Sequence, residues 1–251
     1  MKNHDSPTPD WDSKRYFLPQ ILFFALSLII LWGTLSASPP FETTQHSTYY
    51  HQRSSLFKSL PNSKGEIVFL GDSITDGCEW SEFHGGREIK NRGISGDTTD
   101  GVLERLGEVT ESRPEKIFLM IGVNDLARGE SIDYILNNIA RIIRKVLRNS
   151  QETALYVQSI LPVNPQFDQF PDHTDKGAEI LEINRKLRVF CTRQGVFYID
   201  LHSAFLDENK NLSSLYSNDG LHLTGEGYVL WWSLIEKFVK DPSRPLFPIC
   251  R

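Results

Sequence analysis

Two short segments near opposite ends of the chain carry residue types that could hydrolyse an ester. Ser73 follows an apolar run in Gly71-Asp72-Ser73, where it is either a nucleophile or part of an ordinary helix cap. Asp219 and His222 are three positions apart, ahead of the last predicted helix. At this spacing the carboxylate can accept a hydrogen bond from the imidazole Nδ1–H, so that Nε2 faces a nucleophile. We therefore expect Ser73 to be the nucleophile and His222 the base, oriented by Asp219.

Two further segments could stabilise the negative charge that develops on a carbonyl oxygen. Residues 91–98 contain two glycines ahead of a predicted helix, and such a loop can present backbone N–H groups to an anion or form an ordinary tight turn. Asn124 follows another apolar run and can aim its amide into a site or serve as a turn residue. With Ser73 and His222, the Gly93 N–H and the Asn124 amide complete the set that serine hydrolysis needs.

The elements that must position these residues alternate between strands and helices. Short, continuous apolar runs predict buried strands, and apolar residues at helical spacing predict the helices between them. Such a pattern indicates an α/β fold with a parallel sheet covered on both faces, which binds ligands at the carboxyl ends of its strands. The predicted strands cover residues 66–70, 88–94, 116–122, 153–160 and 196–200, and the predicted helices cover 97–109, 131–149, 174–194 and 224–240.

Composition narrows the functional class. The chain has 251 residues, 39% of them hydrophobic, which is inconsistent with a disordered or collagen-like protein. A net charge of −5 argues against a nucleic-acid partner, which would select a basic surface. Three cysteines cannot form a disulfide framework and are expected to be free thiols. The sequence has no P-loop, G-x-G-x-x-G or H-E-x-x-H motif, so we expect no nucleotide cofactor and no metal.

The N-terminal region has the pattern of a membrane segment. Residues 16–37 contain no charged side chain, follow Lys14 and Arg15, and are long enough to cross a bilayer. We expect residues 1–15 to be a cytoplasmic tail, 16–37 a signal anchor, 38–64 a linker with a short helix near 49–60, and 65–247 the catalytic domain. The domain would then be extracytoplasmic. A cleaved signal peptide, releasing a secreted or periplasmic protein, and a buried helix of the domain are the alternatives.

Taken in order, four segments resemble the sequence blocks of the SGNH hydrolases, also called the GDSL esterase/lipase family. The segments are Gly71-Asp72-Ser73-Ile74-Thr75, residues 91–98 around Gly93, Gly122-Val123-Asn124-Asp125 and Asp219-Gly220-Leu221-His222. The resemblance extends from about residue 66 to 240, and it is strongest to bacterial lysophospholipase, thioesterase and platelet-activating-factor acetylhydrolase-like members.

The resemblance implies both a fold and a set of roles. The expected fold is the flavodoxin-like three-layer α/β/α sandwich. Ser73 is implied as nucleophile, and His222 as the base oriented by Asp219. The implied oxyanion hole consists of the backbone N–H groups of Ser73 and Gly93 together with the Asn124 amide.

Substrate choice is less constrained by the sequence. Trp80 and Phe83 follow the nucleophile closely, and Phe167 and Phe170 lie in a proline-rich loop after the fourth predicted strand. These aromatic residues either line the substrate pocket or pack their own loops. An acetyl group on a carbohydrate and an acyl chain on a lysolipid are both compatible with the site.

Other classes of function are also open. An anchored acyltransferase could use the same triad to pass an acyl group to a sugar or lipid. A non-catalytic glycan- or lipid-binding module is disfavoured, because a binding protein needs no triad. Trp231-Trp232 could contact a membrane, although core packing is the simpler interpretation.

Overall fold

The centre of the protein is a parallel five-stranded sheet, seen in a computed structural model that describes residues 46–63, 65–85 and 89–241. These residues belong to one compact unit, His46–Arg251. The strands occur in the order β2-β1-β3-β4-β5, and every neighbouring pair is parallel. Their bounds are β1 Ile67–Gly71, β2 Ile89–Gly93, β3 Lys116–Met120, β4 Ala154–Gln158 and β5 Phe197–Ile199. Each lies within a predicted strand or extends one residue beyond it.

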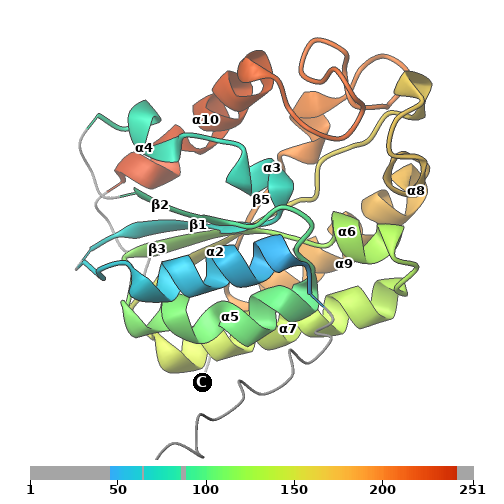
Figure 1. The fold of residues 1–251 in the computed structure, drawn as a ribbon. Helices are drawn as coiled ribbons and strands as arrows, with labels where there is room; N and C mark the ends of the chain where they lie inside the picture. Colours follow the sequence, from blue (N-terminus) through green and yellow to red (C-terminus); the bar gives the residue numbers. More distant parts are fainter. Residues whose placement is uncertain (1–45, 64, 86–88, 242–251) are drawn as a thin grey trace, which may run out of the picture. The chain divides into compact units, whose positions relative to one another are not determined.

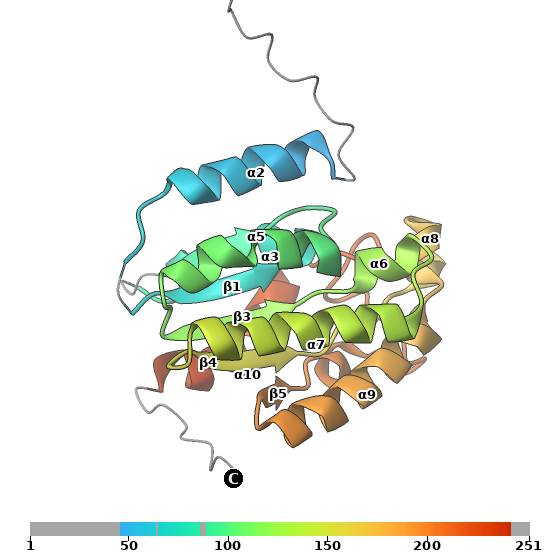
Figure 2. The same cartoon turned by 90° about the horizontal axis from the view of Figure 1, so that it is seen from below.

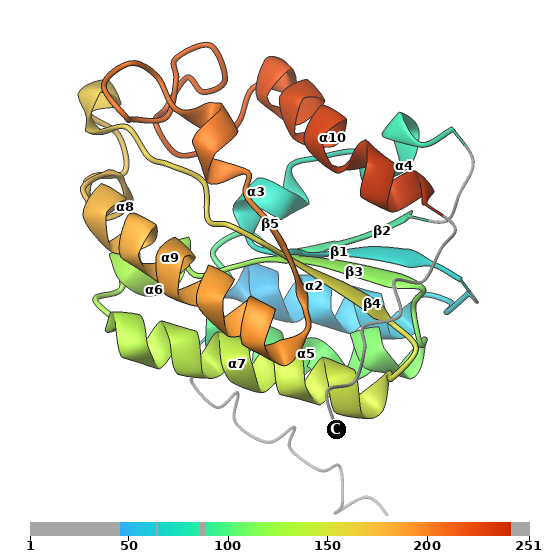
Figure 3. The same cartoon turned by 180° about the vertical axis from the view of Figure 1, so that it is seen from behind.

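Helices cover both faces of this sheet (Figures 1 and 3). One layer contains α5, α7 and α9, while α10 and the short α4 lie on the other face. The bounds are α2 Thr48–Ser59, α3 Ser73–Asp76, α4 Trp80–Phe83, α5 Thr99–Glu111, α6 Val123–Ala127, α7 Ile132–Asn149, α8 Pro171–Thr174, α9 Gly177–Gln194 and α10 Gly225–Lys240, with 3₁₀ turns η1 Pro165–Phe167 and η2 His202–Phe205. The predicted α/β class and parallel sheet are thus confirmed.

A row of aromatic rings crosses the sheet beneath α10. Phe69, Phe118, Tyr156 and Phe197 occupy paired positions on β1, β3, β4 and β5, and neighbouring rings stack at 4.7–4.9 Å. In-register parallel strands place these side chains on one face, where each buries the next. Trp231 and Trp232 on α10 are both buried, so the tryptophan pair that could have met a membrane belongs to the core.

The first helix of the unit, α2, packs against the catalytic domain. It lies beside α5 in the same layer, as the view from below shows (Figure 2). Phe57 on α2 is only 2% exposed and forms a small core with Tyr50 and Ile94. The guanidinium groups of Arg53 and Arg92 lie over its ring, with Cζ at 4.7 and 4.6 Å from the ring centroid.

This packing corrects the described part of the predicted linker, residues 46–63, while residues 38–45 lie outside the described part. The helix expected near residues 49–60 is present, but it belongs to the folded unit, which therefore begins before residue 65. The mixed apolar and charged surface of α2 gave only a weak helical pattern in the sequence. The sequence therefore did not show that Phe57 is buried against the side chains of Arg53 and Arg92.

The predicted tail and anchor, residues 1–37, lie outside the described residues. Across residues 46–63, 65–85 and 89–241, no helix combines the length and apolar character needed to cross a bilayer. Cys78 and Cys191 are buried free thiols, as expected, and Cys250 also lies outside the described part.

We predict that Phe57→Ala lowers the free energy of unfolding by about 3 kcal/mol, because it empties a buried aromatic site. The neighbouring Leu56 is 45% exposed, so Leu56→Ala should change stability by less than about 0.5 kcal/mol. Urea denaturation of the two variants and the parent measures the difference. Equal effects of the two substitutions would show that α2 does not pack as described.

Candidate active site

Ser73, His222 and Asp219 form a continuous hydrogen-bonded chain. Ser73 Oγ lies 3.0 Å from His222 Nε2, and His222 Nδ1 lies 2.8 Å from Asp219 Oδ2. The carboxylate can only accept, so Nδ1 carries a proton and Nε2 accepts the Ser73 hydroxyl proton. The structure therefore brings together the three residues that the sequence predicts as nucleophile, base and orienting acid.

Ser73 is placed by the sharp transition from β1 to α3. It is the first residue of α3, and the preceding Asp72 caps the helix by accepting the Ile74 N–H at 3.1 Å. Parallel strands direct their carboxyl ends to one edge of the sheet, where α3, α6 and α8 lie (Figure 1). The two sequence interpretations of this segment are thus compatible, because Asp72 provides the cap and leaves the Ser73 hydroxyl to His222.

Asp219 is organised as a carboxylate by its own loop. Its Oδ1 accepts the backbone N–H groups of Leu221 at 2.8 Å and His222 at 2.7 Å. Burial opposes ionisation, but these hydrogen bonds and the His222 ring outweigh it, so the pKa of Asp219 lies below its ordinary value. The ionised carboxylate holds the imidazole in one tautomer and one orientation.

Asn124 lies at the start of α6, after β3, with its amide nearly buried. Its Nδ2 donates to the Asp97 carbonyl oxygen at 2.8 Å, which leaves one amide N–H for another acceptor. Its Oδ1 lies 3.0 Å from Nε2 of His173 on α8. His173 was not predicted from the sequence, where its only signal is a histidine in the proline-rich loop that contains Phe170.

The predicted role of Gly93 as an oxyanion donor is wrong for this conformation. The Gly93 N–H donates to Asn91 Oδ1 at 2.8 Å. A Cβ at position 93 would also lie 2.2 Å from the backbone nitrogen of Asp76, so glycine is needed here for the contact between β2 and α3. The sequence shows that the loop contains glycines but not which backbone N–H is already used.

Gly96, the second glycine of this loop, is the better candidate. Its φ of +76° favours glycine, and a Cβ there would meet no atom within 4 Å. Among the described residues, no hydrogen bond is formed by the Gly96 N–H. The next residue, Asp97, accepts a hydrogen bond from the Asn124 amide through its carbonyl oxygen, so Gly96 lies one residue from a direct contact of Asn124.

A buried ion pair fixes this loop to the nucleophile strand. Arg105 on α5 donates to the Asp97 carboxylate at 2.8 Å and to the Gly71 carbonyl at 3.1 Å. Both charged side chains are almost completely buried. The Arg105 guanidinium therefore fixes the position of the loop after β2 relative to the end of β1.

Two of the four predicted substrate contacts lie in the layer formed with α10. Trp80 is only 1% exposed, and its ring stacks on Phe69 at 4.1 Å, so its predicted place in the pocket wall is wrong. Phe83 stacks on Trp232 at 5.3 Å and lines a groove of about 480 Å³ beside Tyr228. A contact between Phe83 and substrate stays a prediction.

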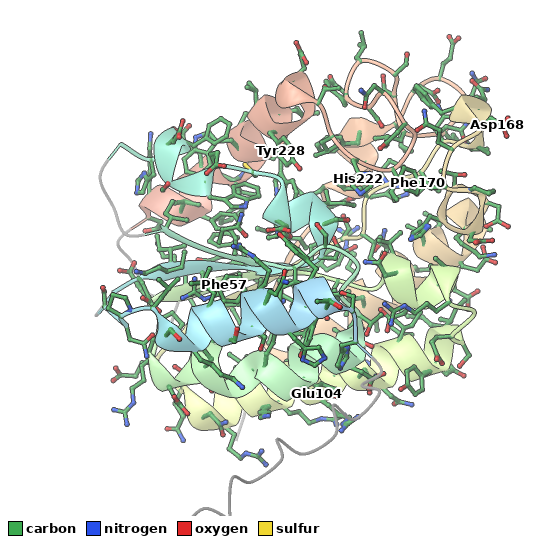
Figure 4. The ribbon with its side chains drawn as sticks, viewed as in Figure 1. Phe57, Glu104, Asp168, Phe170, His222 and Tyr228 are labelled. Carbon is green, nitrogen blue, oxygen red and sulfur yellow. The ribbon has the colours of Figure 1, made fainter. Side chains whose placement is uncertain are left out.

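The other two predicted aromatic residues lie beside the catalytic loop. Phe167 packs next to Gly220, in the segment that joins Asp219 to His222. Phe170 is 42% exposed, and its ring meets the His222 ring edge-on at 5.2 Å (Figure 4). Phe170 also has a φ of +50°, which is unusual for a side chain of its size. Phe170 therefore forms one exposed wall next to the base.

Comparison with known proteins agrees with this geometry. Residues 69–230 match the model of the GDSL-like lipase/acylhydrolase family. The chain belongs to this family. The match includes Ser73, Asn124, Asp219 and His222, so the resemblance seen in the sequence is confirmed.

Individual relatives are distant in sequence. N-acylneuraminate cytidylyltransferase of Streptococcus agalactiae is 28% identical over 185 residues, which are 74% of this chain but 41% of that protein. Human platelet-activating factor acetylhydrolase IB subunit alpha1 is 28% identical over 170 residues, or 65% of this chain and 70% of the relative. A solved GDSL-like lipase of Bacteroides thetaiotaomicron is 25% identical with a TM-score of 0.64, over 76% of this chain and 96% of that one.

We predict that the buried carboxyl of Asp72 makes stability depend on pH. Burial, with the charges of Asp97 and Asp125, raises the pKa of Asp72 to about 7, whereas the unfolded chain ionises it near ~4. Between these values the folded protein binds more protons than the unfolded one, so this contribution to stability is lost as pH rises. Asp72→Asn keeps the cap acceptor and removes the ionisation.

The free energy of unfolding should therefore fall less between pH 4 and 8 in Asp72→Asn than in the parent protein. Urea denaturation at several pH values measures this difference. Asp133→Asn is the matched control, since the Asp133 side chain is 85% exposed. Parallel pH profiles for Asp72→Asn and the parent would contradict the assignment.

Proposed function

We propose that this protein is a serine acylhydrolase that cleaves carboxylic esters of a lipid or carbohydrate through an acyl-enzyme on Ser73. The observation that carries the proposal is the chain from Ser73 Oγ through His222 to Asp219, with contacts of 3.0 and 2.8 Å. Membership of the GDSL family supports ester hydrolysis as the reaction type.

In the proposed reaction, His222 Nε2 takes the Ser73 proton while Oγ attacks the ester carbonyl. The resulting imidazolium is stabilised by the Asp219 carboxylate. When the tetrahedral intermediate collapses, the C–O bond to the alcohol breaks and the alcohol takes the proton from His222. Water then attacks the acyl-enzyme with His222 again as base, which releases the acid and restores the Ser73 hydroxyl.

The proposed oxyanion hole combines the backbone N–H of Ser73, the remaining N–H of the Asn124 amide and the Gly96 N–H in place of Gly93. These donors come from three loops at one edge of the sheet. Donors fixed before the reaction stabilise developing charge without further reorganisation, and each is typically worth ~3 kcal/mol of the barrier.

The alcohol part of the substrate is expected to lie beside Phe170. Its leaving oxygen must receive a proton from His222 Nε2, and the Phe170 ring is 5.2 Å from the His222 ring. A partly exposed aromatic ring at this point favours an apolar or ring-containing alcohol. The acyl group stays open between acetyl and longer chains, and the acetylhydrolase name of the human relative supports the shorter one.

For cellular location we keep the proposal made from sequence. Residues 16–37 act as a signal anchor that holds the catalytic unit outside the cytoplasm, near lipid or glycan esters of the envelope. The support is the uncharged stretch that follows Lys14 and Arg15. Alkaline extraction of membranes tests it, since an anchored chain stays in the membrane pellet and a cleaved one is released.

We predict that Ser73→Ala abolishes hydrolysis of p-nitrophenyl acetate, butyrate, octanoate and palmitate and leaves thermal unfolding unchanged. Ser81→Ala, at an exposed position on α4, is the matched control and should keep full activity. Turnover that persists in Ser73→Ala would overturn the proposal. If the wild type releases acid only slowly but transfers acyl groups to an added sugar or lipid, the transferase is the correct reading.

We predict that Phe170→Ala weakens recognition of the alcohol and not of the acyl group. The KM for phenyl acetate should rise about tenfold, while the KM for ethyl acetate, which has the same acyl group, should change little. Leu181→Ala, at an exposed position of α9, is the control. Equal changes for both esters would show that Phe170 does not contact the leaving group.

A further inference from the structure

We propose that His173 is a positioning residue for the oxyanion hole, which fixes the Asn124 amide so that its free N–H faces the reacting carbonyl oxygen. The inference rests on the proposed esterase function and extends it to a residue outside the triad. The geometry that points to it is the contact of 3.0 Å between His173 Nε2 and Asn124 Oδ1.

The two ends of the Asn124 amide have partners of opposite kind. At one end, the Asp97 carbonyl oxygen can only accept a hydrogen bond, so it selects the NH₂ group. At the other end, Oδ1 needs a donor, and His173 supplies it. An amide turned by 180° would place its oxygen against the Asp97 carbonyl and its NH₂ against the His173 N–H. Both ends would then be mismatched in a buried site.

Donation to Asn124 also sets the protonation of His173. Nε2 must carry a proton, since a bare lone pair would face the amide oxygen. Burial lowers the pKa of His173, and repulsion from His222 lowers it further, which favours the neutral ring. A neutral donor satisfies the amide without opposing the positive charge that His222 acquires during catalysis.

A hydrogen bond to Oδ1 also strengthens the N–H that faces the substrate. Withdrawal of electron density from the amide oxygen makes the NH₂ protons more positive, which is the usual cooperativity of linked hydrogen bonds. The gain matters most when the carbonyl oxygen becomes an oxyanion. We therefore expect His173 to affect kcat rather than KM.

The short helix α8 and its N-cap residue place His173 beside Asn124 and Phe170 beside His222. The backbone N–H of His173 donates to the Phe170 carbonyl at 2.8 Å, and the Phe170 ring lies edge-on to the rings of both His173 and His222, at 6.1 and 5.2 Å. The Thr174 hydroxyl also donates to the Phe170 carbonyl, at 3.2 Å. A single turn of helix thus contacts the base through Phe170 and the oxyanion amide through His173.

A double-mutant cycle tests whether His173 acts through Asn124. The four proteins are the full-length wild type, Asn124→Ala, His173→Phe and the double variant, each assayed for kcat and KM on p-nitrophenyl acetate. We expect His173→Phe to lower kcat about tenfold with little change in KM. The same substitution should have no further effect in the Asn124→Ala background, because the amide that it orients is gone.

His173→Gln is the conservative variant. Its side-chain NH₂ can reach the position of Nε2 and donate to Asn124, so it should restore most of the kcat lost in His173→Phe. His84→Phe is the matched control, a half-buried histidine beside Trp232 that should keep wild-type kinetics. Thermal unfolding of every variant identifies those that fail to fold, and if His173→Phe does, His173→Leu, which also lacks a donor, replaces it in the cycle.

The outcomes separate this inference from the function on which it rests. Losses that multiply in the double variant, or a change confined to KM, overturn the positioning role and leave the esterase intact. Loss of kcat in His173→Gln equal to that in His173→Phe overturns it as well. If the wild type and Ser73→Ala hydrolyse the ester equally, the proposed function itself is wrong.

Discussion

The buried contact of Arg105 with Asp97 and Gly71 is the interaction on which the catalytic edge depends. Ion pairs removed from water are costly to form and are stabilising only when the geometry satisfies both partners. Here the guanidinium also binds a main-chain carbonyl at the end of β1, one residue before Asp72 and two before Ser73. The same Asp97 presents its own carbonyl oxygen to Asn124. Ser73, the loop after β2 and the Asn124 amide are therefore positioned through adjacent atoms of one network.

A second set of contacts brings the base to this edge from the far end of the chain. Tyr228 on α10 donates to the Ile74 carbonyl on α3 at 2.9 Å, and Trp231 donates to Gln158 on β4 at 2.8 Å. At the opposite end of the helix, buried Lys116 donates to the Val239 carbonyl at 3.0 Å. These bonds fix α10 along its length, and the loop that carries His222 leads directly into it.

Much of the fold could be predicted because it depends on local patterns. Five apolar runs mark the strands, and the helix predicted over residues 131–149 corresponds to α7. The triad was also predictable, since the Asp219–His222 spacing is local and Ser73 follows a strand. Features that depend on tertiary contacts could not be predicted. Burial of Trp80 and the choice between two glycines depend on neighbours that are distant in sequence.

The errors have a common physical origin. Gly93 and Gly96 have similar sequence surroundings, and only the position of the Asn91 side chain shows which N–H is occupied. The contact of His173 with Asn124 forms only when α8 packs against α6, because the two residues are 49 positions apart in the sequence. The short helix near residues 49–60 was predicted, but its burial was not, since it depends on contacts with Ile94 and Arg92 of other segments.

The distance in sequence between nucleophile and base has a consequence for how activity arises during synthesis. Ser73 and His222 are 149 residues apart, and the loop with His222 is held by the last helix. A contact of such high sequence separation forms late, because the entropy of closing the loop must first be overcome. A chain still emerging from the ribosome has the serine but lacks its base. Hydrolytic competence therefore arises only after the segment with His222 and α10 has been synthesised, and docking of α10 is the event that creates it.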